Sequence, residues 1–379
     1  MLAPGLFLCS TLWLIDNSKS SRMTPAEPEI LFARKGAAGL VTLNRPQALN
    51  AVTLGMVRAL TAQLEKWRND LSVTRVVVTA AGGKAFSAGG DIRALYDAGT
   101  SGRHAEMLAF YGEEYVLNTI IKHYPKPYVS LIDGICMGGG VGVSAHGSHR
   151  VAGDRYLFAM PEVGIGFFPD VGATWFLPRM PGELGAYCAL TGERFGAADG
   201  IAAGIATHRV ASPRFTDLVE ALCGTAPVDA MLAAFAAPTK DAASESKLAP
   251  HRSTIDRLFA GGRVEDILAA LDADGGEFAQ KAAATIRAKS PVALKIALAQ
   301  VRKGKDLAFE ACMATEFRIV SRVIHGHDFY EGVRAVIVDK DNAPKWQPAA
   351  LAEVSDAEVA RHFAPLPDGE WQPPELVRG

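Results

Sequence analysis

Two carboxylates, Glu162 and Asp170, stand eight residues apart in a stretch made otherwise of apolar, glycine and proline residues and a few polar ones. The stretch covers residues 157–179 and reads LFAMPEVGIGFFPDVGATWFLPR. Its glycines and prolines interrupt any regular helix or long strand, and its apolar residues predict a loop that folds inward against the core. A carboxylate carried inward is costly unless it is partnered, and its pKa tends to rise. That profile is typical of a catalytic acid, base or carboxylate nucleophile.

A purely structural role for the two carboxylates is the alternative. In that interpretation Glu162 caps a neighbouring turn and Asp170 is the N-cap of a helix that starts near Val171. A helix start at this point would also supply N–H groups that hold Asp170 ionised.

Two glycine-rich turns, at residues 82–91 (GGKAFSAGGD) and 134–140 (GICMGGG), could supply a second kind of chemistry. Each follows a predicted buried strand, VTRVVVTA or YVSLIDG, and each opens a predicted helix. The first N–H groups of a helix are unpaired, so two such groups converging from two loops would form an oxyanion hole. Glycines that merely permit tight strand–helix packing are the alternative. Neither turn fits a nucleotide-binding fingerprint.

The elements that must position these groups indicate an α/β fold. Strands alternate with helices from residue 29 to about residue 180, and the remainder is mostly helical. We expect a loose extension at residues 1–22, a core with the active site at 23–225, a helical region at 226–346 and an irregular tail at 347–379. The stretches 53–67, 103–122, 226–237, 264–288, 291–303, 307–324 and 330–338 are expected to be helical, and residues 240–252 to form a linker or exposed loop.

Composition narrows the class of protein. The chain has 379 residues, of which 49% are hydrophobic and 21% charged, with a formal net charge of −2 and no dense basic block. This balance argues against nucleic acid and against a polybasic membrane contact. The apolar run Leu6–Ile15 is too short to span a bilayer and lacks a basic segment before it. The five cysteines are scattered, so neither disulfides nor a zinc site is indicated, and we expect a cytoplasmic location.

From about Glu29 to Trp346 the chain resembles the enoyl-CoA hydratase/isomerase (crotonase) superfamily, and within it the 3-hydroxyisobutyryl-CoA hydrolase branch. The fold implied is a spiral core of ββα units with a C-terminal helical region. The motifs that carry the resemblance are NRPQALNA (44–51), KAFSAGGDI (84–92), EEYVLN (113–118), GICMGGGVGVS (134–144), the 157–179 stretch and HDFYEGVRAVIVDKDNAPKW (327–346).

The resemblance implies a role for each residue of the site. The oxyanion N–H groups fall on Gly90 and Gly139, and the catalytic glutamate falls on Glu162. The hydrolase branch adds Asp170. The resemblance also implies substrate contacts from Glu114, Gly89, Asp91 and Gly138. Hydratases of the superfamily carry a second catalytic glutamate at the position that Gly142 occupies here. The glycine at this position leaves the hydratase pair incomplete, which puts a hydration activity in doubt.

The reaction implied is hydrolysis of 3-hydroxyisobutyryl-CoA to 3-hydroxyisobutyrate and CoA, a step of valine catabolism. Glu162 either attacks the thioester or activates water, while Asp170 holds the β-hydroxyl or assists proton transfer. The resemblance implies no metal or bound cofactor, since CoA enters as part of the substrate, and allows a homo-oligomer. The alternatives are a hydratase or isomerase, a hydrolase of another acyl-CoA, and a non-catalytic acyl-CoA-binding protein.

Overall fold

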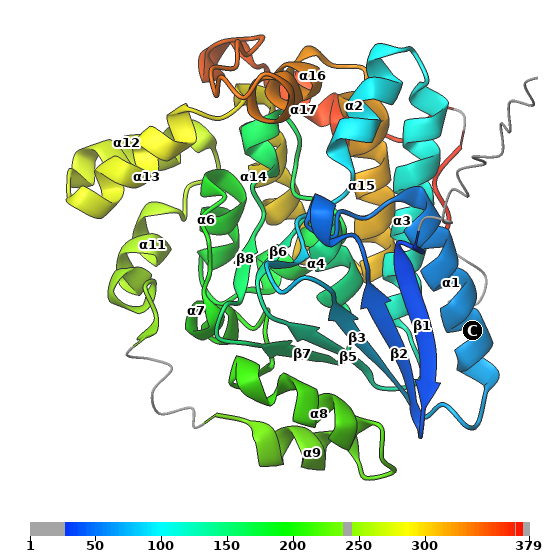
Figure 1. The fold of residues 1–379 in the computed structure, drawn as a ribbon. Helices are drawn as coiled ribbons and strands as arrows, with labels where there is room; N and C mark the ends of the chain where they lie inside the picture. The colour runs from blue at the N-terminus through cyan, green and yellow to red at the C-terminus, as the bar shows by residue number, and fades with distance from the viewer. Residues whose placement is uncertain (1–26, 238–244, 368, 374–379) are drawn as a thin grey trace, which may run out of the picture.

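Two mainly parallel β-sheets form the centre of the computed structural model, which describes residues 27–237, 245–367 and 369–373 (Figure 1). The loose extension expected at residues 1–22 lies outside the described residues, as does part of the linker expected at 240–252.

The larger sheet has the strand order β1-β2-β3-β5-β7-β9, antiparallel between β1 and β2 and parallel elsewhere. The smaller sheet has the order β4-β6-β8 and is parallel. The strands are β1 (Ile30–Lys35), β2 (Ala38–Leu43), β3 (Arg75–Ala80), β4 (Ala85–Ser87), β5 (Tyr128–Ile132), β6 (Ile135–Met137), β7 (His149–Ala152), β8 (Leu157–Ala159) and β9 (His208–Arg209).

Consecutive strands divide between the two sheets. β3, β5 and β7 enter the larger sheet, and the short strands that follow them, β4, β6 and β8, enter the smaller one. Helices separate these strand pairs along the chain, which gives the repeated ββα unit that the sequence predicts. Each strand of the smaller sheet lies within one of the three segments singled out in the sequence: β4 within residues 82–91, β6 within residues 134–140 and β8 within residues 157–179.

The helices of the first half are α1 (Leu54–Asn69), α2 (Ile92–Thr100), α3 (His104–Lys122), α4 (Gly139–Ser144), α5 (Ala173–Phe176), α6 (Leu184–Thr191), α7 (Ala197–Ala202), α8 (Phe215–Leu222) and α9 (Val228–Phe235). Those of the second half are α11 (Arg252–Leu258), α12 (Val264–Asp274), α13 (Glu277–Arg287), α14 (Pro291–Gly304), α15 (Phe309–Val323), α16 (His327–Val333) and α17 (Asp356–Phe363). Short 3-10 helices lie at Pro46–Ala48, Glu162–Ile165 (η2), Leu177–Arg179 (η3), Ser212–Arg214, Ala249–His251 and Leu351–Glu353, and a π-helical turn lies at Arg334–Val338.

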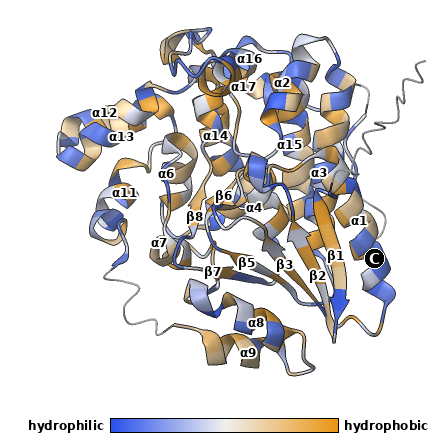
Figure 2. Cartoon of the chain, in the orientation of Figure 1, coloured by the Kyte–Doolittle hydropathy of each residue, from blue (hydrophilic) through white to orange (hydrophobic). Residues whose placement is uncertain are grey.

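The central strands β3 and β5 of the larger sheet are largely buried on both faces, as the continuous run of β-branched residues in β3 predicts, whereas the edge strand β1 is mostly exposed. Helices α8 and α9 cover one face, where their leucines pack against Val77, Val129 and Val151 (Figure 1). The hydropathy colouring shows β2 and most of β1 in the hydrophobic colour (Figure 2). The rest of the core lies on the other side, between the two sheets and helices α1, α3, α14 and α15.

Two sequence predictions for the second half need correction. The stretch 264–288 is two helices rather than one, because Gly275 ends α12 and Gly276 is the N-cap of α13. The tail expected to be irregular contains α17, which begins after Ser355 because its hydroxyl accepts a hydrogen bond from Glu358 N. Phe363 of that helix is buried in the main core.

Candidate active site

One cavity of about 420 Å³ brings most of the predicted site residues together. It is bounded by both glycine-rich turns, by one side of α3 and by the loop around η2. Seven of the eight predicted residues line it: Gly89, Gly90, Glu114, Gly138, Gly139, Glu162 and Asp170.

The two glycine-rich turns lie against each other at one end of this cavity. A methyl group on Gly139 would come 3.2 Å from Gly90 N and 2.7 Å from Glu114 Oε1. On either side of Gly90, Val52 N donates to Gly89 O and Asp91 N donates to Val52 O, which leaves the Gly90 N–H outside this pairing. Gly139 opens α4, so its N–H belongs to the unpaired first turn of a helix. Among the described residues, neither N–H has a recorded hydrogen-bond acceptor.

Glu162 faces the same glycines from the other side. It begins η2, directly after β8, and its side chain is buried. A methyl group on Gly138 would lie 3.4 Å from Glu162 Oε1, and Glu162 Oε2 has no hydrogen-bond partner among the described residues. Burial raises the pKa of Glu162 well above its ordinary value, and the nearby Asp170 and Glu316 raise it further. The carboxyl is therefore held in the cavity as a group ready to exchange a proton.

Asp170 lies in the cavity, but its pKa is raised, whereas the sequence predicted a carboxyl held in its ionised form. Its Oδ2 accepts a hydrogen bond of 3.0 Å from the Tyr115 hydroxyl, and burial raises its pKa to about 7. The expected N-cap is wrong, because α5 begins at Ala173 with Gly172 as its N-cap and no side-chain cap. No helix N-terminus therefore holds Asp170 in its ionised form.

Helix α3 supplies Glu114 and separates it from its neighbour Glu113. Consecutive helical residues point about 100° apart, so Glu114 is buried while Glu113 is only half-buried and pairs with Arg58 at 2.6 Å. Glu114 Oε1 has no hydrogen-bond partner among the described residues. Burial raises the pKa of Glu114 well above its ordinary value, with Asp170 and Glu316 adding to the rise.

A fourth buried carboxyl, Glu316 on α15, was missed by sequence reasoning. It is fully buried, and its two oxygens accept hydrogen bonds of 2.8 Å from Gly172 N and Thr174 N. Burial and the charge of Asp170 raise the pKa of Glu316 to about 8. A sequence signal exists: Glu316 falls in the buried stripe of α15 formed by Phe309, Cys312, Met313, Thr315, Ile319, Val320 and Val323.

Asp91 is the predicted residue that the structure does not place in the cavity. Its side chain caps α2 by accepting a hydrogen bond from Ala94 N at 3.2 Å, and it forms an ion pair with Arg45 at 3.0 Å. It holds the end of the first glycine-rich turn in place.

The C-terminal region closes the cavity, which sequence reasoning did not anticipate when it assigned the active site to residues 23–225. Lys289, Val336, Ile337 and Asn342 all line the cavity. Helix α16 packs directly on η2, since a methyl group on Gly332 would come 2.3 Å from the carbonyl carbon of Ile165. The site is therefore built from both halves of the chain.

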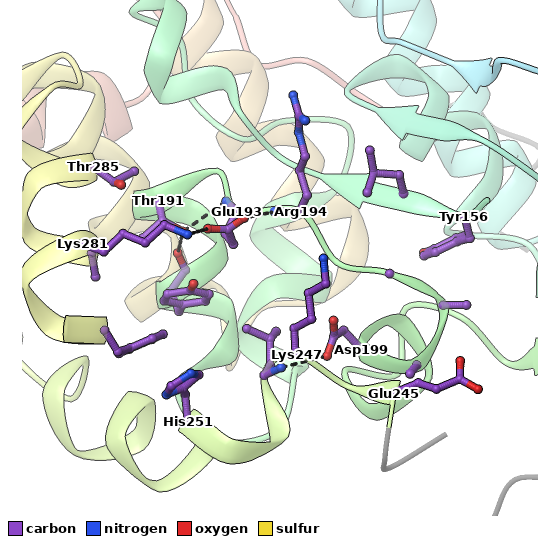
Figure 3. A pocket seen from close by; sticks show the side chains of 18 of the residues that line it. Tyr156, Thr191, Glu193, Arg194, Asp199, Glu245, Lys247, His251, Lys281 and Thr285 are labelled. Atoms are coloured by element: carbon purple, nitrogen blue, oxygen red, sulfur yellow. Dashed lines mark hydrogen bonds and ion pairs between the residues drawn. The ribbon is translucent and has the colours of Figure 1, made fainter. Parts of the chain in front are cut away.

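A larger cavity, of about 750 Å³, lies beside α6, α7 and α13 and contains none of the predicted site residues (Figure 3). Its charged groups are largely matched: Lys281 lies 3.9 Å from Glu193, and Asp199 accepts hydrogen bonds from the Ser246 hydroxyl and Leu248 N. Its lining therefore shows no equivalent of the unpartnered carboxyls around Glu162.

Within the described ranges, no group of three or more His, Cys, Asp or Glu side chains is arranged to hold a metal ion. No helix in that part of the chain is long and apolar enough to cross a bilayer.

Known proteins of three names are similar to this chain. Proteins named mitochondrial 3-hydroxyisobutyryl-CoA hydrolase are 46% identical in Danio rerio, over 90% of this chain and 91% of the relative, and 42% identical in Homo sapiens, over 93% of both. A carnitinyl-CoA dehydratase structure from Mycobacterium thermoresistibile matches with a TM-score of 0.85 and 45% identity, covering 90% of this chain and 98% of that one. An enoyl-CoA hydratase structure from Rhodobacter sphaeroides 2.4.1 matches with a TM-score of 0.84 and 39% identity, covering 91% and 100%.

The cytoplasmic location expected from the cysteines is wrong, because these curated relatives are named mitochondrial. Cys136, Cys188, Cys223 and Cys312 are indeed free and buried. Unpaired cysteines indicate a reducing compartment, however, and do not distinguish one such compartment from another.

The match to a family agrees with the geometry of the site. The family model described as enoyl-CoA hydratase/isomerase matches residues 38–363, a range that contains every cavity residue discussed above. The two sheets with their ββα units, the paired glycine-rich turns and the similar structures lead to the same conclusion. The chain belongs to the enoyl-CoA hydratase/isomerase family.

Proposed function

We propose that this protein hydrolyses an acyl-CoA thioester, with 3-hydroxyisobutyryl-CoA as its substrate and 3-hydroxyisobutyrate and CoA as products. The curated relatives at 41–46% identity carry the name of this hydrolase. The cavity around Glu162 offers the two kinds of group the reaction needs, namely N–H donors for a developing oxyanion and carboxyls with raised pKa values.

The observation that carries this proposal is the closed space at Gly142. In a hydratase this position would hold the second catalytic glutamate. Here a methyl group on Gly142 would already lie 2.7 Å from Asn118 Nδ2 and 3.0 Å from Val171 Cβ. A glutamate side chain has no room there, whereas Asp170 reaches the cavity from another direction. The acid–base groups thus differ in number and position from a hydratase pair.

The first step places the thioester carbonyl oxygen between the N–H groups of Gly90 and Gly139. As the carbonyl carbon is attacked, negative charge develops on this oxygen, and each donor is typically worth roughly 3–4 kcal/mol of barrier. Both N–H groups are held by backbone, so they need no reorganisation when the charge appears.

Glu162 acts in its ionised form by one of two routes. It attacks the carbonyl carbon, the C–S bond breaks to release CoA, and water then cleaves the resulting mixed anhydride. Alternatively it removes a proton from water, which attacks the carbonyl carbon directly. In both routes the leaving sulfur takes up one proton, and a neighbouring protonated carboxyl, Asp170 or Glu114, can supply it.

Asp170 and Glu114 also recognise the acyl end in this proposal. Asp170 is anchored by Tyr115, so its second oxygen can accept a hydrogen bond from the substrate's β-hydroxyl. Glu114 Oε1 faces the oxyanion turn and bounds the space available to the acyl carbons.

Dehydration or hydration is the second candidate function, because the two similar solved structures are titled carnitinyl-CoA dehydratase and enoyl-CoA hydratase. Both activities use the same oxyanion turns, so the fold alone does not separate them.

A thiol-release assay across four CoA esters separates the candidates. We expect fastest release of CoA from the 3-hydroxyisobutyryl ester, slower release from the 3-hydroxypropionyl and isobutyryl esters, and no net hydration of crotonyl-CoA. Crotonyl-CoA consumption without thiol release would identify a hydratase instead. Binding of all four esters without turnover would leave only an acyl-CoA-binding role.

A further inference from the structure

A second cavity, of about 420 Å³, lies at the C-terminal end of α3, about two turns of helix from Glu114. Its lining is rich in cationic and aromatic side chains and contains no carboxylate. Its charged residues are Lys122, Lys126, Arg150 and Arg179. A cavity lined by four cations and no anion is unusual in a chain of formal net charge −2.

Lys122 is the cation with the fewest partners. Its Nζ lies 3.7 Å from the centre of the Trp175 ring, and Arg179 stacks on the same ring at 4.7 Å. Within the part of the chain that the structure describes, Lys122 has no carboxylate within ion-pair distance. The carboxylate that attracts it, Glu310, is already paired with His123 at 2.6 Å.

The cations of this cavity repel one another. Burial lowers the pKa of Lys122, and the nearby Arg150 and Arg179 lower it further. Arg150 donates to three backbone carbonyls, those of Gly147, Gly204 and Ile205. Carbonyls satisfy its hydrogen bonds but carry no net charge, so the repulsion between the cations persists unless an anion neutralises it.

A buried polar atom on the same wall also lacks a partner. His146 lines the cavity and is 6% exposed, and its Nε2 bonds Val171 O at 2.6 Å. Its Nδ1 has no hydrogen-bond partner among the described residues. Unsatisfied buried groups commonly mark the place of a missing ligand or water.

We propose that this cavity binds a phosphate-bearing small molecule, held by Lys122, Arg150 and Arg179 through its phosphate and by Trp175 and Tyr124 along its organic part. Phosphate oxygens match both the fork of a guanidinium and the point charge of an ammonium. The volume exceeds that of a bare ion and falls in the range of small-molecule pockets.

The proposed phosphate site includes residues of the stretch 157–179, which also carries Glu162 and Asp170. Trp175 and Arg179 follow Asp170 in the same stretch, and His146 holds the carbonyl of Val171, the residue next to Asp170. A ligand bound there would therefore contact the segment that positions one of the cavity carboxyls. This inference does not depend on which CoA ester is hydrolysed.

Calorimetric titration of the full chain with inorganic pyrophosphate, in phosphate-free buffer at constant ionic strength, tests the proposal. We expect saturable binding, and a pyrophosphate-dependent rise in the thermal midpoint that an equal ionic strength of chloride does not produce. The variant K122Q should bind about tenfold more weakly or worse, since one charge-assisted contact is lost. K122R should retain most of the affinity, because it keeps the charge.

Lys303→Gln is the matched control, since Lys303 also lies over an aromatic ring, that of Phe363 at 4.8 Å, but outside this cavity. It should bind pyrophosphate as the unmodified chain does. Thermal midpoints of all variants without pyrophosphate establish that each is folded. The proposal is overturned by an absence of saturable binding, by K122Q binding as tightly as the unmodified chain, or by K303Q losing as much affinity as K122Q.

Discussion

Four buried carboxyl groups lie within or beside the stretch 157–179. They belong to Glu114, Glu162, Asp170 and Glu316, and in the described part of the chain none of them has a cation within ion-pair distance. Burial is the main cause of their raised pKa values, and the charges of Asp170 and Glu316 raise the pKa values of Glu114 and Glu162 further. At neutral pH the four groups therefore hold protons that ordinary carboxyls would have lost. Proton supply to a leaving group and proton removal from water can then come from the same set of side chains.

Replacing the two carboxylates of the catalytic loop should separate their roles. Glu162→Gln keeps the size and hydrogen bonding of the side chain but removes the nucleophile or base, so we expect roughly 10²–10⁴ lower kcat with acyl-CoA binding retained. Asp170→Asn should slow the β-hydroxy esters most and bring their rates closer to that of isobutyryl-CoA. Steady-state thiol release on both kinds of ester measures this difference. Equal losses on every ester would show that Asp170 shares in the chemistry.

The pH dependence of kcat/KM should report the shared protons. Because Glu162 reacts in its ionised form and its pKa is raised well above the ordinary value, kcat/KM should fall with decreasing pH at a higher pH than an ordinary glutamate would give. Asp170→Asn removes a negative charge that raises the pKa of Glu162, so the midpoint of this fall should move to lower pH. Glu113→Gln is the control, since Glu113 faces solvent beside Glu114 and pairs with Arg58. A midpoint that stays fixed in Asp170→Asn would show that the two carboxyls do not interact.

Sequence patterns identified the residues of the site better than the ionisation states of their side chains. The spacing of Glu162 and Asp170 in an apolar stretch identified these two carboxylates and the two glycine-rich turns, and the family resemblance identified Glu114 and the individual glycines, so that seven named residues line the cavity. The state of Asp170 was predicted wrongly, because two N–H groups at the expected helix start donate to Glu316 instead. Glu316 lies 146 residues further along the chain than Asp170, and no local pattern reveals a partner at that distance.

At the scale of elements, one side chain of helix α15 forms two hydrogen bonds to the stretch 157–179. Both oxygens of Glu316 accept hydrogen bonds from backbone N–H groups that follow Asp170, and Phe309 of the same helix packs on Trp175. Glu316 contacts no part of the proposed substrate and acts as a positioning residue.

Glu316→Gln should disturb these hydrogen bonds without removing the side chain. The amide offers one acceptor in place of two, which leaves a buried N–H unpaired at a cost of about 1–3 kcal/mol in the free energy of unfolding. We also expect the acid fall of kcat/KM to move to lower pH, because the charge of Glu316 raises the pKa of Glu162. Chemical denaturation and the pH profile measure the two effects. Glu310→Gln, on the same helix, should leave the pH profile unchanged, and a destabilised Glu316→Gln with an unshifted profile would reduce Glu316 to a structural role.

The presence of a helix or strand was predictable where hydrophobic residues recur in a regular pattern. Helices α1, α3, α14 and α15 and strands β3 and β5 fall within a few residues of their expected ranges. The break between α12 and α13 and the helix α17 were missed because they depend on contacts made elsewhere: α17 is short, and it is stabilised by packing Phe363 into the main core.

For the whole molecule, the buried carboxyls predict that stability falls as the pH rises from about 6.5 to 8. Asp170 and Glu316 have folded pKa values of about 7 and 8 and ordinary values near 4, so the folded chain binds more protons than the unfolded chain in this window. By linkage the free energy of unfolding then decreases with pH, by at most about 1.4 kcal/mol per pH unit for each group. His146, whose pKa is lowered to about 4, acts in the opposite direction but only below about pH 6.5.

Urea unfolding between pH 6.5 and 8 measures this slope. Glu316→Gln and Asp170→Asn should each make it shallower, since each removes one group that holds a proton in the folded chain and not in the unfolded chain. Asp272→Asn serves as the control, because Asp272 is exposed and pairs with Arg287 on the surface. A free energy of unfolding that rises with pH across this range would contradict the proton count.

The closure of the cavity by Lys289, Ile337 and Asn342 has a consequence for the order in which the protein is made. A ribosome releases the glycine-rich turns and Glu162 first, and the wall that completes the pocket emerges more than a hundred residues later. Until residue 342 has emerged, the cavity lacks part of its wall. A chain still being made therefore carries every carboxyl of the site before it has the complete cavity that encloses them.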